Sequence, residues 1–270
     1  DILCKSYAME REKAIAFFDS GIGGLTVLFE ALQTLPKENY LYFADSKNAP
    51  YGIKSKEEVH NLVKKAVDFL LGKDIKALII ACNTATSVTI EDLRKSYSIP
   101  IIGMEPAVKP AVEKSEQNHK RVIVTATPLT LKEEKLKNLI ERVDNEHIVD
   151  LLPLPELVPM AEEGKFNTIQ AREYLKREFA QFELSDYGTV VLGCTHFIFF
   201  KKIFQEILPS HIDVIDGNKG TITNLKRILT EKNLLNDSGS SNIEYFISME
   251  KIPDSEASKR MEGLFKILKH

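Results

Sequence analysis

The chain has 270 residues, of which 43% are apolar and 28% are charged, and its formal net charge is −3. This composition is typical of a globular protein with a sizeable core, and it argues against disordered and fibrous structure. Because charges of both signs are mixed along the chain, no basic patch for nucleic acid is evident, and we expect a small-molecule partner.

The cysteines and the lengths of the apolar runs indicate in which cellular compartment the protein works. The three cysteines Cys4, Cys82 and Cys194 contain no C-x-x-C pair and form no disulfide framework, which favours a reducing environment. The apolar runs are far shorter than the ~20 residues that span a bilayer. Residues 1–13 lack the apolar segment of a signal peptide, and because Met9 could be the natural start we treat them as an N-terminal extension outside the fold. We therefore expect a cytoplasmic protein without a membrane partner.

Strand and helix patterns alternate almost from end to end, which is typical of βαβ units around a mainly parallel sheet. In the first block, apolar runs predict strands at residues 14–18, 40–43, 77–81 and 100–102. Regularly spaced leucines predict a helix that begins near Leu25 and is stopped by Pro36. Ser55 and Glu58 have capping-box spacing, so a second helix is predicted over residues 55–71.

A second block of the same design follows a segment with Pro106 and Pro110 that we interpret as a linker. Its predicted strands are residues 121–124, 148–152, 189–192 and 212–215. Thr130 and Glu133 have capping-box spacing and predict a helix from about Thr130. Further helices are predicted over residues 168–182, 223–235 and 256–269. We interpret the two blocks as a structural duplication with domain 1 over 14–106 and domain 2 over 107–216, and with 217–270 returning to domain 1.

Each block delivers a cysteine to the carboxyl end of a predicted strand, where α/β proteins place their chemistry. The two motifs are Cys82-Asn83-Thr84 and Cys194-Thr195-His196. A single free cysteine is more often a small buried hydrophobe, but the polar neighbours of both suit reactive thiols. His196 could be a satisfied polar residue, or an imidazolium that lowers the pKa of Cys194 and exchanges protons with it.

Polar turns follow the first two strands. Asp19-Ser20-Gly21-Ile22-Gly23-Gly24 brings backbone N–H groups to a helix N-terminus, which favours a carboxylate ligand. It is not the G-x-G-x-x-G pattern, so no nicotinamide cofactor is expected. Asp19 alone is equally compatible with helix capping and with catalysis. Ala49-Pro50-Tyr51-Gly52 predicts a turn whose backbone could contact a ligand, and Glu162 alone would be a solvated helix start.

Taken together, these motifs resemble glutamate racemase. The motifs that carry the resemblance are Asp19 to Gly24, Pro50-Tyr51-Gly52, Ala81 to Ala85 and Leu192 to His196, in the family's order. The resemblance runs from about Ala14 to at least Asp216. Aspartate racemases resemble the chain less well, because their second cysteine motif typically carries Glu at the position of His196.

The resemblance implies two similar doubly wound, mainly parallel α/β domains related by pseudo-two-fold symmetry, with the active site between them. It implies a cofactor-independent and metal-free homodimer that supplies D-glutamate for peptidoglycan. Cys82 would act on D-glutamate with Asp19 assisting, Cys194 would act on L-glutamate with His196 assisting, and Glu162 matches a further acidic position. The remaining substrate-binding positions would be Ser20, Pro50, Tyr51, Gly52, Asn83, Thr84, Thr127 and Thr195.

The chain departs from the family pattern at two places. Leu129 stands where the family usually has glycine after Thr127. Phe197-Ile198-Phe199-Phe200 replaces the common Tyr-Pro-Leu-Leu, so we expect an altered approach to the following helix.

Three alternatives stay open at the level of sequence. The first is a racemase of aspartate. The second is a cysteine hydrolase with His196 as its base, which leaves one cysteine without a role. The third is an amino-acid binding module that uses the glycine turn without exchanging the α-proton. A metal site is disfavoured because Cys-x-His spacing matches no common zinc pattern.

Overall fold

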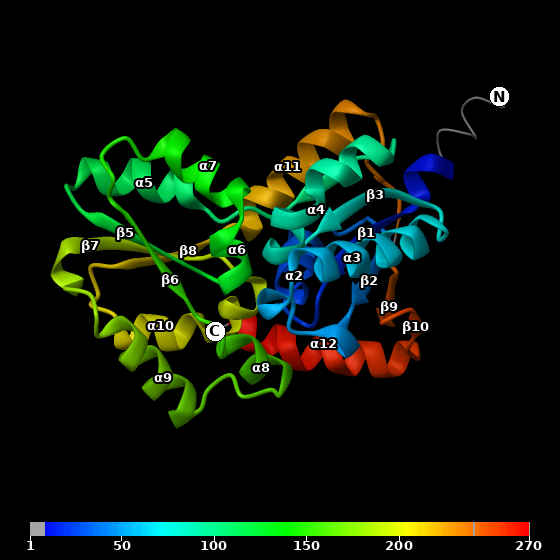
Figure 1. The fold of residues 1–270 in the computed structure, drawn as a ribbon. Coiled ribbons are helices and arrows are strands. Elements are labelled where there is room, and N and C mark those ends of the chain that lie inside the picture. Colours follow the sequence, from blue (N-terminus) through cyan, green and yellow to red (C-terminus); the bar gives the residue numbers. More distant parts are fainter. Residues whose placement is uncertain (1–8, 240, 270) are drawn as a thin grey trace.

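The computed structural model describes residues 9–239 and 241–269, which form two β-sheets with helices packed around each (Figure 1). Residues 1–8 of the predicted extension, with Cys4, lie outside the described residues. The predicted fold class, α/β with two mainly parallel sheets, is confirmed. In the part of the chain that is described, no helix combines the length and apolarity needed to cross a membrane.

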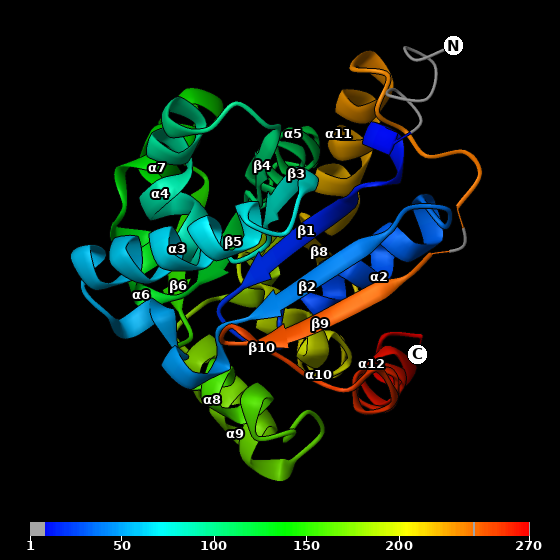
Figure 2. The ribbon, with the colours of Figure 1, turned by 90° about the vertical axis from the view of Figure 1, so that its right-hand side faces the viewer.

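The first sheet has six strands in the order β10-β9-β2-β1-β3-β4. They are β1 (Ala14–Asp19), β2 (Tyr40–Ala44), β3 (Ile75–Ile80), β4 (Ile101–Gly103), β9 (Ile243–Ile247) and β10 (Glu250–Lys251). All pairs are parallel except β9 with β10. Strand β9 lies beside β2, so the end of the chain joins the first sheet (Figure 2).

The second sheet has four parallel strands in the order β6-β5-β7-β8. They are β5 (Arg121–Ala126), β6 (Val149–Pro153), β7 (Tyr187–Leu192) and β8 (Asp213–Asp216). The register of β5 against β7 shifts after Arg121, just as the register of β1 against β3 shifts after Ala14. This shared irregularity at the first residue of the leading strand supports the interpretation of a duplication.

Helices cover both sheets. They are α2 (Leu25–Thr34), α3 (Lys56–Leu71), α4 (Asn83–Ser96), α5 (Val108–Gln117), α6 (Pro128–Lys132), α7 (Glu134–Val143), α8 (Leu157–Glu162), α9 (Ile169–Phe179), α10 (Lys201–Ile207), α11 (Asn218–Glu231) and α12 (Asp254–Leu268). Those that begin at Leu25, Lys56, Ile169 and Asp254 start within two residues of a predicted start, whereas the helix predicted over residues 223–235 begins at Asn218. The predicted capping box of Ser55 and Glu58 is present at α3. It satisfies backbone donors that would otherwise lack partners.

Two local predictions are wrong. Pro110 lies in the first turn of α5 rather than in a linker, because its missing N–H is not needed there. Thr130 does not begin a helix with Glu133 as its capping partner: Thr127 caps the short helix α6 by accepting from the Thr130 N–H, and α7 begins separately after Glu133. Thr127, three residues before Thr130, therefore caps this helix in place of Thr130.

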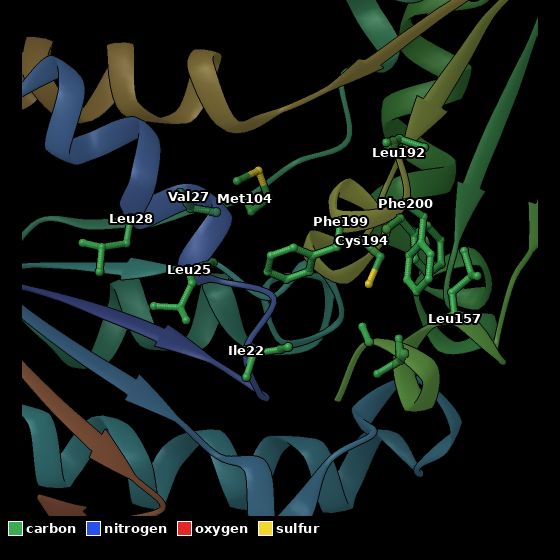
Figure 3. Packing of buried hydrophobic residues seen from close by; sticks show 14 of the residues in the cluster. Ile22, Leu25, Val27, Leu28, Met104, Leu157, Leu192, Cys194, Phe199 and Phe200 are labelled. Carbon is green, nitrogen blue, oxygen red and sulfur yellow. The ribbon is translucent and has the colours of Figure 1, made fainter. Parts of the chain in front are cut away.

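The largest core cluster joins the two halves of the chain (Figure 3). Ile22 and Leu25, beside the first sheet, belong to the same cluster as Leu157, Cys194 and Phe199 of the second half. The segment that departs from the family pattern forms a 3₁₀ helix, η4 (Thr195–Phe200), whose buried phenylalanines help to fill this core. Packing across the two halves fixes the position of Cys194 at their junction.

Candidate active site

The two cysteines follow the carboxyl ends of equivalent strands, β3 and β7. Cys82 is the N-cap of α4, where its Sγ accepts from the Ala85 N–H over 3.4 Å. Cys194 directly precedes η4. The hydroxyl of the next residue, Thr195, donates to Asp19 Oδ2 at the end of β1 over 3.0 Å. The sequence motifs of the two blocks therefore meet where the two sheets face one another.

Asp19 is fully buried between the two motifs. Its Oδ1 accepts from the Gly21 N–H over 2.9 Å, and its Oδ2 accepts from Thr195. Burial raises the pKa of Asp19 to about 6, while the charge of His196 opposes a larger rise. The N-cap of α2 is Gly24, so the capping interpretation of Asp19 is wrong and its carboxylate faces the second half of the chain. A carboxyl group with this pKa can exchange protons near neutral pH.

Cys82 lies on the Asp19 side of the site. Its thiol donates to Ser20 Oγ over 3.6 Å. Burial, and after it the negative charge of Asp19, raises the pKa of the Cys82 thiol to about 12. In this arrangement Cys82 therefore carries its proton.

Cys194 has a different partner set. Its Sγ lies 3.9 Å from His196 Nδ1, and His196 Nε2 lies 2.6 Å from Glu162 Oε1. Burial alone would lower the pKa of His196, but its hydrogen bonds with Cys194 and Glu162 outweigh burial and hold that pKa well above its ordinary value. His196 is consequently an imidazolium near neutral pH, and it lies beside the thiol of Cys194.

Glu162 is the last residue of α8, and the interpretation as a solvated helix start is wrong. Its side chain is only 21% exposed. Besides meeting His196, Oε1 accepts from the Ile22 N–H over 2.8 Å. No local sequence pattern predicts these contacts of Glu162, because its partners His196 and Ile22 belong to distant segments of the chain.

Three threonine hydroxyls meet at another part of the site. Thr84 Oγ1 lies 2.8 Å from Thr127 Oγ1 and 3.1 Å from Thr130 Oγ1, and the last two are 3.0 Å apart. All three residues are buried. Thr130 was not among the predicted site residues, because its spacing to Glu133 indicates helix capping. The hydroxyl three residues after Thr127, at the start of a short helix, was the available signal.

The other predicted residues surround these groups. Pro50 precedes the short 3₁₀ helix η2 (Tyr51–Ile53), and a Cβ on Gly52 would lie 2.3 Å from Thr127 Cβ. The buried Tyr51 donates its hydroxyl to Asp45, not toward the cysteines. Asn83, the first residue of α4, is also buried. Among the described residues, no group of three or more His, Cys, Asp or Glu could hold a metal ion.

The site is closed in this structure. Cys82 is 6% exposed and Cys194 is 7% exposed, so a substrate can reach them only when covering groups move. A cavity of about 750 Å³ lies elsewhere, between α2, α10 and the end of α12, and neither cysteine lines it.

Comparison with known proteins places this geometry in a family. The family model described as Asp/Glu/Hydantoin racemase matches residues 25–225. Glutamate racemase 2 of Bacillus subtilis (strain 168) is 51% identical over 254 residues, which cover 94% of this chain and 96% of that protein. A crystal structure of a glutamate racemase isoform from Bacillus anthracis is 29% identical, with a TM-score of 0.80 and coverage of 94% and 95%.

A third similar protein was solved with a ligand. The glutamate racemase of Francisella tularensis in complex with D-glutamate is 27% identical, with a TM-score of 0.79 and coverage of 96% of this chain and 95% of that chain. Residues 25–225, which the family model matches, include both cysteine motifs. The chain therefore belongs to the Asp/Glu/Hydantoin racemase family, and the predicted resemblance to glutamate racemase is confirmed.

Proposed function

We propose that this protein interconverts L- and D-glutamate by proton transfer between two cysteines, without a cofactor, and supplies D-glutamate for peptidoglycan in the cytoplasm. The observation that carries the proposal is the matched placement of Cys82 and Cys194 at equivalent strand ends, each with its own acid–base partner. The names of relatives that share about half of its residues support glutamate as the substrate. The predicted homodimer and the domain boundaries at 106/107 and 216/217 are also part of this proposal. The pairing of β9 with β2 supports the predicted return of residues 217–270 to domain 1.

Each thiol would serve one face of the substrate. In the L-to-D direction the Cys194 thiolate takes the α-proton, so that the Cα–H bond breaks and an S–H bond forms. The Cys82 thiol then protonates the resulting carbanion from the opposite face and becomes a thiolate. A general base and a general acid on opposite sides are the minimum that stereochemical inversion requires.

The surrounding groups fit this direction. The raised pKa of Cys82 keeps it protonated as the donor, and the imidazolium of His196 stabilises the Cys194 thiolate. The charge of Asp19 acts on the Cys82 thiol, so Asp19 can assist in returning a proton to the Cys82 thiolate. In the D-to-L direction the two thiols exchange roles, with Asp19 assisting Cys82 as base.

The decisive experiment uses L-glutamate in deuterated water. After exhaustive dialysis, and without added pyridoxal phosphate or metal, the protein should produce D-glutamate labelled at the α-carbon. L-Aspartate, assayed in parallel, should be a poor substrate. Activity that appears only when pyridoxal phosphate is restored would contradict the two-thiol mechanism, and a preference for aspartate would select the alternative substrate.

The three threonines offer a test of substrate binding. We propose that Thr84, Thr127 and Thr130 bind the side-chain carboxylate, because three buried hydroxyls that converge can all donate to one anion. Thr130→Val removes one donor while keeping the shape of the side chain, and it should raise KM for glutamate by about tenfold with little change in kcat. Steady-state kinetics provide the measurement. An unchanged KM would exclude Thr130 from the binding site.

A further inference from the structure

Tyr42 is a fully buried phenol beside the glycine turn. It lies on β2 between β1 and β9, and its ring packs against Tyr245 with centroids 5.0 Å apart. Its hydroxyl donates a 2.7 Å hydrogen bond to the Gly21 carbonyl. A buried phenol usually has a defined hydrogen-bond partner, and here the partner belongs to the turn that follows Asp19.

This hydrogen bond fixes a peptide plane that also faces the site. The C=O of Gly21 and the N–H of Ile22 belong to one planar peptide and point in opposite directions. That N–H donates to Glu162 Oε1 over 2.8 Å. The preceding N–H, of Gly21, donates to Asp19 Oδ1 over 2.9 Å. A rotation of the peptide away from Tyr42 would therefore weaken its bond to the Glu162 carboxylate.

The turn is held tightly between the phenol and the carboxylates. A Cβ on Gly21 would lie 1.8 Å from Glu162 Oε1. A Cβ on Gly24 would lie 2.9 Å from Tyr42 Oη and 2.6 Å from Asp19 Cβ. Only glycine fits at such close approaches, so the turn and the groups around it depend on one another for their positions.

We propose that Tyr42 is a positioning residue for racemisation. It acts through the Gly21–Ile22 peptide on Glu162, whose Oε1 lies 2.6 Å from His196 Nε2. His196 in turn lies beside Cys194. Tyr42 therefore orients the acid–base partners of the second thiol although it neither touches substrate nor transfers a proton. The inference rests on the proposed function of the site.

Tyr40 supplies a matched control. It lies two residues earlier on β2, is also buried, and donates its hydroxyl to the Leu35 carbonyl over 2.7 Å, at the other end of α2. The Tyr40 hydroxyl also lies 3.2 Å from the Ala31 carbonyl, so Tyr40→Phe removes at least as much buried hydrogen bonding as Tyr42→Phe and should lower the thermal midpoint at least as far. Only Tyr42→Phe should lower kcat for L-glutamate, by about tenfold or more per mole of folded enzyme, with KM changed less than about threefold. Tyr40→Phe should keep kcat within about twofold of wild type.

A double-mutant cycle tests the route of the effect. In a Glu162→Gln background, Tyr42→Phe should change kcat less than about threefold, because the group that it orients is already altered. Additive losses in this cycle, equal losses of kcat in the two Phe variants, or an unchanged kcat in Tyr42→Phe would overturn the positioning role. A wild-type protein that does not racemise glutamate would overturn the proposed function instead, so the two failures are distinguishable.

Discussion

Cys82→Ser and Cys194→Ser are each expected to lower kcat for glutamate racemisation by ~10³-fold or more. Serine nearly preserves the shape of cysteine, but its hydroxyl is a far weaker acid than a thiol and does not ionise near neutral pH. Either variant therefore lacks the base for one face of the substrate and the donor for the same face in the reverse direction. The measurement is the formation of D-glutamate from L-glutamate, followed by circular dichroism.

A third cysteine provides the control for these variants. Cys4→Ser changes a thiol that stands in neither strand-end motif, and it should retain wild-type turnover. Substantial turnover in either site variant would mean that the corresponding thiol is dispensable. Retention by only one variant would favour exchange of the α-proton by a single cysteine, whereas the cysteine hydrolase would require an acyl intermediate trapped on one thiol.

His196→Asn is expected to lower kcat/KM by ~10²-fold or more and to move its dependence on pH. The substitution removes the imidazolium that favours the Cys194 thiolate. It also removes the charge that opposes the rise of the Asp19 pKa, which is about 6 in the wild-type protein. If Asp19 must be ionised for turnover, kcat/KM falls below about pH 6 in wild type, and this acid limb should move to higher pH in the variant.

The pH profile separates this effect from simple damage. Loss of activity with an unshifted acid limb would show that His196 does not influence Asp19. A shift to lower pH would have the opposite sign to the one that removal of a positive charge requires. Thermal unfolding of the same variant controls for loss of folded protein.

Most of the fold follows from local patterns. Strands β1, β3, β5 and β7 are mostly apolar because nearly all of their residues are buried, and such strands are easily recognised. The capping box of α3 is equally local. Strand β9 was not predicted, because it is only partly buried and contains Glu244. Its place beside β2 depends on a contact between segments some two hundred residues apart.

The site was predictable where a motif and a strand end coincide. Cys82 and Cys194 could be identified because both follow buried strands and have polar neighbours. The contacts of Glu162 with His196 and Ile22 could not be identified from the residues alone, since three separate segments create them. Thr130 shows the other kind of failure, in which one spacing fits two explanations and the capping explanation was wrong.

The duplication gives the two thiols equivalent backbone positions, but their partners differ. Cys82 faces the carboxylate of Asp19, while Cys194 faces the imidazolium of His196 and, behind it, Glu162. Because of this asymmetry the two cysteines should not be interchangeable, and the resemblance to glutamate racemase implies which enantiomer each one serves. The two serine variants should therefore fail in full turnover while each retains a different half of the chemistry.

The most direct measurement of this central claim is elimination of the leaving group from β-substituted analogues of L- and D-glutamate, which requires removal of the α-proton but not its return. Cys82→Ser should eliminate from the L-analogue through Cys194, and Cys194→Ser should eliminate from the D-analogue through Cys82. Each variant should be inactive toward the opposite enantiomer. If both variants process the same enantiomer, or if neither processes either one, the assignment of one thiol to each face is contradicted.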